Sequence, residues 1–180
     1  MNKITILILV LTTILSHAQQ AVEKQATPPK YTQKLFHDGN IYIGPQPDYV
    51  DFADIKDAGF TKVINNRTLG EMKDLKFYED YLLKKAGIEY VFIPIGDEGN
   101  EYSPEKLKEF AQAIESADGK VLLHCRSGHR ASQMWAAYLV QYKGKTPDEA
   151  LEMVSDMGWW PMPMESLLNK KLSVQFAEEK

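Results

Sequence analysis

Residues 121–132 constrain the fold more than any other segment, because an apolar run there changes abruptly into a polar loop. The run Val-Leu-Leu ends at His124, and a helical pattern resumes a few residues later. Cys125, the only cysteine among 180 residues, stands at the point of change. A thiol between a strand end and a helix start lies among unpaired N–H groups at the positive end of the helix, and both favour the thiolate. Arg126 and Arg130 add positive charge. We therefore expect Cys125 to act as a nucleophile toward an anionic group.

The alternative for Cys125 is a small buried hydrophobe, which is what many lone cysteines are. Its neighbours argue against that alternative. Two arginines, two histidines, a serine and a glycine lie within five residues of it. Charged and titratable groups gathered around one thiol are typical of a functional site.

Apolar segments of strand and helix type alternate along the chain. Strands are predicted at residues 41–43, 61–64, 88–95 and 121–124, and helices at 49–58, 72–86, 104–114, 129–142 and 147–157. This alternation predicts an α/β fold of three layers, with a mainly parallel central sheet flanked by helices. Ligands of such sheets bind beyond the carboxyl ends of the strands, where the Cys125 loop lies.

The N-terminus has the pattern of an export signal. Lys3 precedes a short apolar core, and small residues at 16 and 18 predict cleavage after Ala18. The alternative is an uncleaved anchor, but the core is shorter than the roughly 20 residues that span a bilayer. We expect a signal peptide at 1–18, a flexible leader at 19–34 and one domain at 35–180, in a periplasmic or secreted protein without a stable membrane anchor.

The mature chain is mildly acidic, with 20 basic and 25 acidic side chains once residues 1–18 are removed. An acidic chain without a basic stripe argues against a nucleic-acid partner. The histidines that remain, at positions 37, 124 and 129, have no metal-ligand spacing, so neither a metal nor another cofactor is expected.

The string His-Cys-x-x-Gly followed by Arg, at residues 124–130, resembles the active-site loop of the cysteine-dependent protein phosphatases, especially the compact dual-specificity type. It is also similar to the loop of rhodanese-type sulfurtransferases. The resemblance from about residue 39 to 158, with segments 40–47 and 58–67 as further matches, is to the phosphatase-like domain of the beta-lactamase hydrolase-like proteins. It implies a protein tyrosine phosphatase-like fold.

The resemblance also implies roles for particular residues. Cys125 would attack phosphorus, Arg130 would stabilise the phosphate oxygens, and Asp97 would protonate the leaving group, with Glu98 as the alternative acid. His124 would orient the loop and help to lower the pKa of Cys125, and Ser132 would support the loop. The anion would be held by the remaining loop positions, namely Arg126, Ser127, Gly128, His129 and Ala131.

One departure from the phosphatase pattern leaves the reaction open. Four residues separate Cys125 from Arg130, whereas the phosphatases have five, so Ala131 stands where their arginine would be. A shift of one residue rotates a helical position by about 100°. A tighter loop would suit a persulfide, so the alternatives to phosphoester hydrolysis are sulfur transfer from a sulfane-sulfur donor or anion binding without turnover. Asp97 favours the phosphatase, because sulfur transfer needs no acid.

Two further segments have structural interpretations. Arg67 and Glu71 are expected to pair near the end of the second strand. The aromatic and methionine-rich residues 159–164 are expected to seal one edge of the core, or alternatively to form a docking lip.

Overall fold

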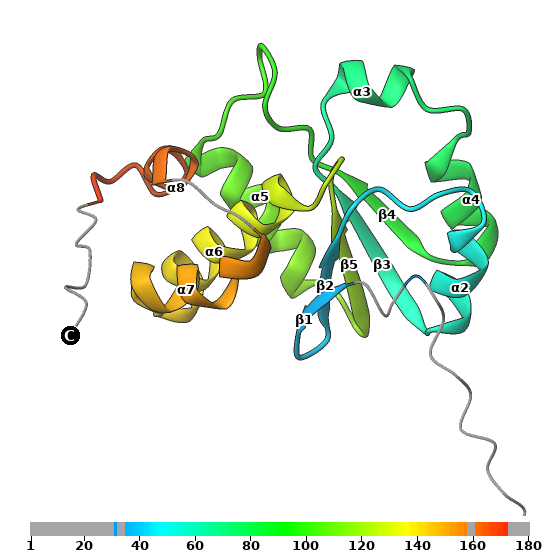
Figure 1. Cartoon of the computed structure of the whole chain (residues 1–180), viewed down its shortest axis with the longest axis horizontal. Helices are drawn as coiled ribbons and strands as arrows, with labels where there is room; N and C mark the ends of the chain where they lie inside the picture. The colour runs from blue at the N-terminus through cyan, green and yellow to red at the C-terminus, as the bar shows by residue number, and fades with distance from the viewer. Residues whose placement is uncertain (1–30, 32–34, 158–160, 173–180) are drawn as a thin grey trace, which may run out of the picture.

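The structure is a computed structural model that describes Tyr31, residues 35–157 and residues 161–172. Its centre is a five-stranded sheet in the order β1-β2-β5-β3-β4, in which only β1 is antiparallel to its neighbour (Figure 1). The strands are β1 (Phe36–Asp38), β2 (Ile41–Gly44), β3 (Phe60–Asn65), β4 (Glu89–Phe92) and β5 (Lys120–His124). The strand that feeds the cysteine loop therefore lies in the middle of the sheet.

Helices cover both faces of the sheet, and Figure 1 shows α2 and α4 on one side with α5 to α8 on the other. The helices are α2 (Asp51–Asp57), α3 (Leu69–Lys73), α4 (Glu79–Ala86), α5 (Pro104–Glu115), α6 (His129–Lys143), α7 (Pro147–Met153), a 3-10 turn η2 (Ser155–Met157) and α8 (Pro161–Leu168). The predicted three-layer α/β fold with a mainly parallel sheet is confirmed.

Two apolar cores hold the layers together, one on each face of the sheet. Because side chains alternate along a strand, Leu122 of β5 packs with α2 and α4, whereas Val121 and Leu123 face α5 and α6. All three are fully buried. Burying one such side chain contributes about 1.5–3 kcal/mol, so β5 is anchored from both sides before it reaches Cys125.

Helix caps that can be read from the sequence are present in the structure. Ser103 caps α5 by accepting the Lys106 N–H, with Pro104 in the first turn. At α7 the Thr146 and Glu149 side chains accept each other's backbone N–H groups, which is a complete capping box. These interactions are local, and this explains why the sequence locates both helix starts.

The prediction of a single helix over residues 72–86 is wrong. The structure has two separate helices there, α3 ending at Lys73 and α4 beginning at Glu79. Between them Phe77 packs edge-on against Phe52 of α2. No glycine or proline lies in the break, so tertiary contacts on either side override the helical pattern.

Two smaller differences concern the ends of elements. β4 spans Glu89–Phe92 rather than 88–95, and α7 ends at Met153, after which η2 occupies the rest of the predicted helix. Met164 is fully buried in the core beside α6, which agrees with a sealing role for residues 159–164.

The predicted signal peptide, nearly all of the predicted leader and residues 159–160 lie outside the described residues. Among the described helices, none is both long and apolar enough to span a membrane.

Candidate active site

The cysteine loop connects the carboxyl end of β5 to the N-terminus of α6, as its sequence predicts. Cys125 is 1% exposed. The Gly128 N–H donates to the Cys125 Sγ atom over 3.2 Å. Gly128 has the left-handed φ of 97° that glycine tolerates best. The loop therefore turns a backbone donor onto sulfur at the start of a 15-residue helix.

A substitution of Gly128 is expected to destabilise the protein for two reasons. A Cβ at this position would lie 2.7 Å from the Met157 Cε atom and 3.3 Å from the Gly44 carbonyl oxygen. We expect Gly128→Ala to cost about 1–2 kcal/mol for its φ and a further cost of about 1 kcal/mol, the low end for overpacking, because the end of the Met157 side chain can move whereas the Gly44 backbone cannot. Urea unfolding measures the loss.

Gly144→Ala is the matched control for that substitution. Gly144 also has a positive φ, but an added Cβ would have nothing within 4 Å. The free energy of unfolding of Gly144→Ala should therefore fall only by the cost of the positive φ. Equal losses in the two variants would contradict a close approach of Met157 and Gly44 to the loop.

Arg130 is held in place by two partners. Its Nη2 atom donates to both carboxylate oxygens of Glu71, over 2.8 and 2.7 Å, and its Nη1 atom donates to the Ile95 carbonyl oxygen over 3.0 Å. Burial lowers the pKa of Arg130, but hydrogen bonding to Glu71 and the nearby Cys125 outweigh it and raise this pKa above its ordinary value. The guanidinium is thus a fixed cation close to the thiol.

Glu71 was expected to pair with Arg67, and this expectation is only partly right. Arg67 Nη2 donates to the backbone carbonyl of Glu71 over 3.0 Å, whereas the Glu71 carboxylate binds Arg130. The same carboxylate accepts the Thr68 N–H in the capping box of α3. Burial raises the pKa of Glu71, but the Thr68 N–H and Arg130 lower it below the usual range. Glu71 therefore ties α3 to the cysteine loop as a carboxylate.

The one-residue displacement of the arginine determines whether its side chain faces the core or the pocket. Ala131 is fully buried in the core cluster on the α5 and α6 side, so an arginine there would point into the core. Arg130 instead reaches the pocket beside the loop. Ser132 is buried, and its Oγ atom donates to the His129 carbonyl oxygen over 2.8 Å. The predicted support from Ser132 thus acts on the first turn of α6.

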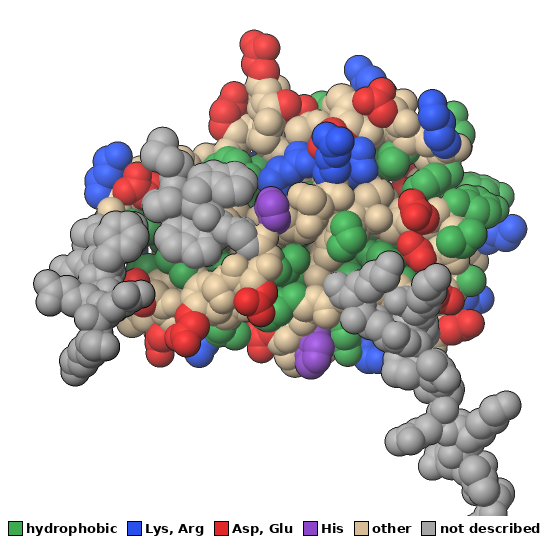
Figure 2. Space-filling model, in the orientation of Figure 1, with side chains coloured by type: hydrophobic (Ala, Val, Ile, Leu, Met, Phe, Trp, Pro, Cys, Tyr) green, Lys and Arg blue, Asp and Glu red, His purple; other side chains and the backbone are tan. Residues whose placement is uncertain are grey.

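An open pocket of about 450 Å³ lies next to the loop. Its lining includes two predicted loop residues, Ser127 and His129, together with Arg130; the others are Thr68, Glu71, Gly96 and Tyr102. Burial raises the pKa of Tyr102 to about 12, although Arg130 lowers this pKa and Cys125 adds to the increase. The side of the pocket formed by Tyr102 therefore presents a neutral phenol. Figure 2 shows Lys and Arg side chains gathered with a His over the carboxyl end of the sheet. The pocket suits an anion.

Arg126 and Gly128 are the remaining residues of the loop that was predicted to hold the anion. The Arg126 side chain is exposed, and its carbonyl oxygen accepts the Gln46 N–H over 3.3 Å. This bond ties the loop to the segment that follows β2. Gly128 itself is buried.

The two candidate acids have different environments. Asp97 is partly buried, and its Oδ2 atom accepts the Leu69 N–H at the start of α3 over 3.2 Å. Its Oδ1 atom is buried and has no hydrogen-bond partner among the described residues. Glu98 is exposed. Asp97 is not among the residues that line the pocket, although its neighbour Gly96 is.

Beneath the loop lies a buried carboxylate that the sequence analysis missed. Glu79 Oε1 is 3.0 Å from His124 Nε2, and both side chains are fully buried. His124 Nδ1 lies 3.4 Å from the Cys125 carbonyl oxygen. The sequence contains no local signal for this pair, because an acidic residue at the start of a helix is ordinarily explained by the helix dipole.

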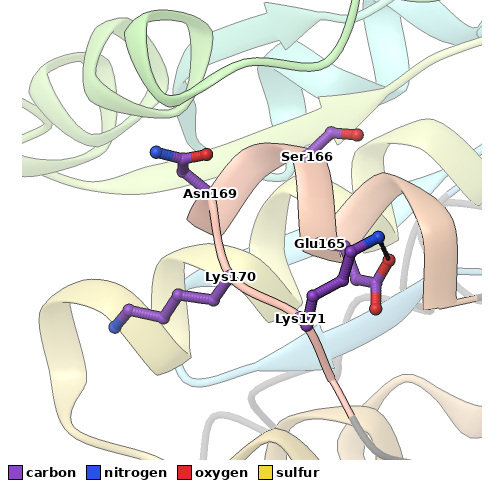
Figure 3. Close-up of a pocket in the computed structure, with 5 residues that line it drawn as sticks. All are labelled: Glu165, Ser166, Asn169, Lys170 and Lys171. Atoms are coloured by element: carbon purple, nitrogen blue, oxygen red, sulfur yellow. Dashed lines mark hydrogen bonds and ion pairs between the residues drawn. The ribbon is translucent and has the colours of Figure 1, made fainter.

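Outside the cysteine loop, the described residues offer little for ligand binding. Within the described residues, no group of three or more His, Cys, Asp or Glu side chains is placed to hold a metal ion. A second pocket of about 260 Å³ lies at the end of α8 (Figure 3). Its side chains are polar and solvated, and Lys171 pairs loosely with Glu165 over 3.5 Å. That pocket lacks a buried functional group.

The fold and the loop together define the phosphatase-like class of cysteine-loop α/β domains. The family model described as "Beta-lactamase hydrolase-like protein, phosphatase-like domain" matches residues 36–141. The chain belongs to this family.

Particular relatives agree with this assignment. A beta-lactamase hydrolase-like protein of Xylella fastidiosa is 31% identical over 98 residues, which are 53% of this chain but only 22% of that protein. Tk-PTP in its active form superposes with a TM-score of 0.64 at 24% identity, covering 76% of this chain and 94% of that one. A phosphatase candidate from Neisseria meningitidis superposes with a TM-score of 0.60 at 26% identity, covering 76% and 96%. The predicted protein tyrosine phosphatase-like fold is confirmed.

Proposed function

We propose that this protein hydrolyses a phosphomonoester through a cysteinyl-phosphate intermediate. The observation that carries the proposal is the Gly128 N–H, which lies 3.2 Å from the Cys125 Sγ atom at the N-terminus of α6. A helix N-terminus binds anions through its free N–H groups and its dipole. The same groups that stabilise a thiolate can hold the oxygens of a phosphoryl group in the transition state.

In the first step, the Cys125 thiolate attacks phosphorus as the bond to the ester oxygen breaks. Loop N–H groups and the Arg130 guanidinium stabilise the equatorial oxygens. Asp97 donates its proton to the departing alkoxide. In the second step, water attacks phosphorus as the Asp97 carboxylate accepts a proton from it. The sulfur–phosphorus bond breaks, the thiolate and inorganic phosphate are released, and Asp97 is again protonated.

The assignment of the acid to Asp97 rests on its surroundings. A general acid has to reach the leaving group directly or through one water. Asp97 is partly buried, follows the pocket residue Gly96, and has one carboxylate oxygen without a hydrogen-bond partner among the described residues, whereas Glu98 is exposed. Asp97 is therefore the first acid to test.

A second candidate, sulfur transfer through a Cys125 persulfide, is favoured by one observation. The guanidinium of Arg130 is already bonded to Glu71, which reduces the positive charge available to a phosphate dianion. A persulfide carries less charge and needs less compensation.

Parallel assays of one purified sample distinguish these reactions. We expect turnover of a generic aryl phosphate and no thiocyanate formation from thiosulfate and cyanide. The reverse result would establish sulfur transfer. No turnover of either substrate, with phosphate still binding at the loop, would establish a non-catalytic anion-binding module.

We also propose that the protein is exported and acts in the periplasm or outside the cell. The support is the short apolar segment after Lys3 and the small residues before position 19. Mature protein should begin near Gln19, which intact-mass measurement on native material would show. A soluble cytoplasmic form that retains residues 1–18 would refute the proposal.

A further inference from the structure

The carboxylate of Glu79, at the start of α4, is fully buried beneath the cysteine loop. Burying a carboxylate without partners is very unfavourable. Three neutral donors reach it: Gln46 Nε2 over 3.0 Å on one oxygen, and Asn65 Nδ2 over 2.7 Å and the Tyr90 hydroxyl over 3.3 Å on the other. Every donor comes from a different element, so the site is built by the tertiary fold around one negative charge.

The charge state of Glu79 follows from these neighbours. Burial raises its pKa, but His124 and the hydrogen bonds from Gln46 and Asn65 outweigh burial and hold the pKa below its usual range. Burial and the Glu79 charge raise the pKa of Tyr90, so the phenol remains a donor. Glu79 is therefore an anion at neutral pH.

His124 faces an acceptor on each side of its ring. Nε2 lies 3.0 Å from Glu79 Oε1, and Nδ1 lies 3.4 Å from the Cys125 carbonyl oxygen. A neutral imidazole has one N–H and can donate to only one of them, whereas an imidazolium donates to both. The ring therefore bridges the Glu79 carboxylate and the peptide unit of the nucleophile.

We propose that Glu79 is a positioning residue for the nucleophile. Through His124 it orients the Cys125 peptide unit and keeps a positive charge beside the thiolate. This inference rests on the proposed function only in taking Cys125 as the nucleophile, and its test needs no turnover.

Other charged or titratable groups surround the pair. Tyr90 comes from β4 and Tyr31 from the segment before β1, and burial raises the pKa of both. Arg67 reaches Glu79 indirectly, because its Nη1 atom donates to the Gln46 amide oxygen over 3.2 Å. The cysteine loop adds its own cations, Arg126 and Arg130, together with His129, while Asp80 follows Glu79 on α4. Substitutions at Glu79 leave all of these groups in place.

Iodoacetamide alkylation across pH tests the proposal, because Cys125 is the only thiol in the chain. Glu79→Gln removes the carboxylate that pairs with His124, and the pH of half-maximal alkylation should rise. We expect the rate near pH 6 to fall by about tenfold, which corresponds to one pH unit. Glu79→Asp keeps the charge and should stay close to the wild type, and Asp80→Asn, at an exposed neighbour, should not change the curve.

The direction of the shift separates this role from simpler ones. Removing a negative charge near a thiol would by itself favour the thiolate and move the curve to lower pH. A curve for Glu79→Gln that is unchanged or moved to lower pH would therefore overturn the proposal. Circular dichroism at the assay temperature verifies that each variant is folded.

A second set of variants keeps the test decisive if Glu79→Gln does not fold. His124→Gln removes the cation directly and should raise the half-maximal pH; no shift in that variant overturns the proposal. Where both single variants fold, the double variant should show the shift of one alone, because the two residues act in series. Additive shifts in the double variant would contradict the proposal that Glu79 acts through His124. If the wild type does not turn over an aryl phosphate, the proposed function is refuted, but the alkylation result is unaffected.

Discussion

Cys125→Ser is expected to reduce turnover of both alkyl and aryl phosphates to the uncatalysed background. A serine hydroxyl at this position is a far weaker nucleophile than a thiolate, and no general base among its described contacts would activate it. Fold and anion binding should persist, because the loop N–H groups and Arg130 are unchanged. Steady-state turnover and calorimetric phosphate titration measure the two properties. Residual turnover near the wild-type level would show that the reaction does not use this thiol.

Asp97→Asn is expected to lower turnover of an alkyl phosphate by roughly 10²–10⁴-fold. The loss on an activated aryl phosphate should be much smaller, because a stable aryloxide leaves without a proton. Steady-state kinetics with the two substrates under identical conditions measures this difference.

The comparison between substrates is what identifies the acid. Asp97 also accepts the Leu69 N–H at the start of α3, and an asparagine can retain that hydrogen bond through its amide oxygen. Equal losses on alkyl and aryl phosphates would therefore indicate a structural role for Asp97, and Glu98→Gln would be tested next. If sulfur transfer were the reaction, Asp97→Asn would leave thiosulfate turnover almost unchanged.

The polar contacts around the site suggest how α3 is held. This short helix buries none of its residues. It is connected to the cysteine loop by the Glu71–Arg130 ion pair and to the segment after β4 by Asp97. Because Glu71 is also part of the capping box of α3, the same carboxylate stabilises the helix start and orients the arginine. A substitution of Glu71 would therefore affect both.

The sequence by itself determined the features that depend on neighbours along the chain. The apolar residues of β5, the glycine in the loop and the start of α6 identify a strand–loop–helix unit around Cys125 without any tertiary information. The capped starts of α5 and α7 belong to the same group, since each cap joins residues three positions apart. The alternation of strands and helices sufficed for the layered fold.

The tertiary structure decided which charges meet at the site. Arg130 pairs with Glu71 across 59 positions of sequence, and His124 pairs with a carboxylate 45 positions before it. These contacts also account for the break between α3 and α4, because Glu71 reaches the pocket side of the loop and Glu79 lies beneath it. Local helical propensity amounts to less than about 1 kcal/mol per residue, whereas leaving a fully buried carboxylate such as Glu79 without its partner costs about 3–5 kcal/mol. The distant partners therefore prevail over the helical pattern, and a pattern of neighbours along the chain does not reveal them.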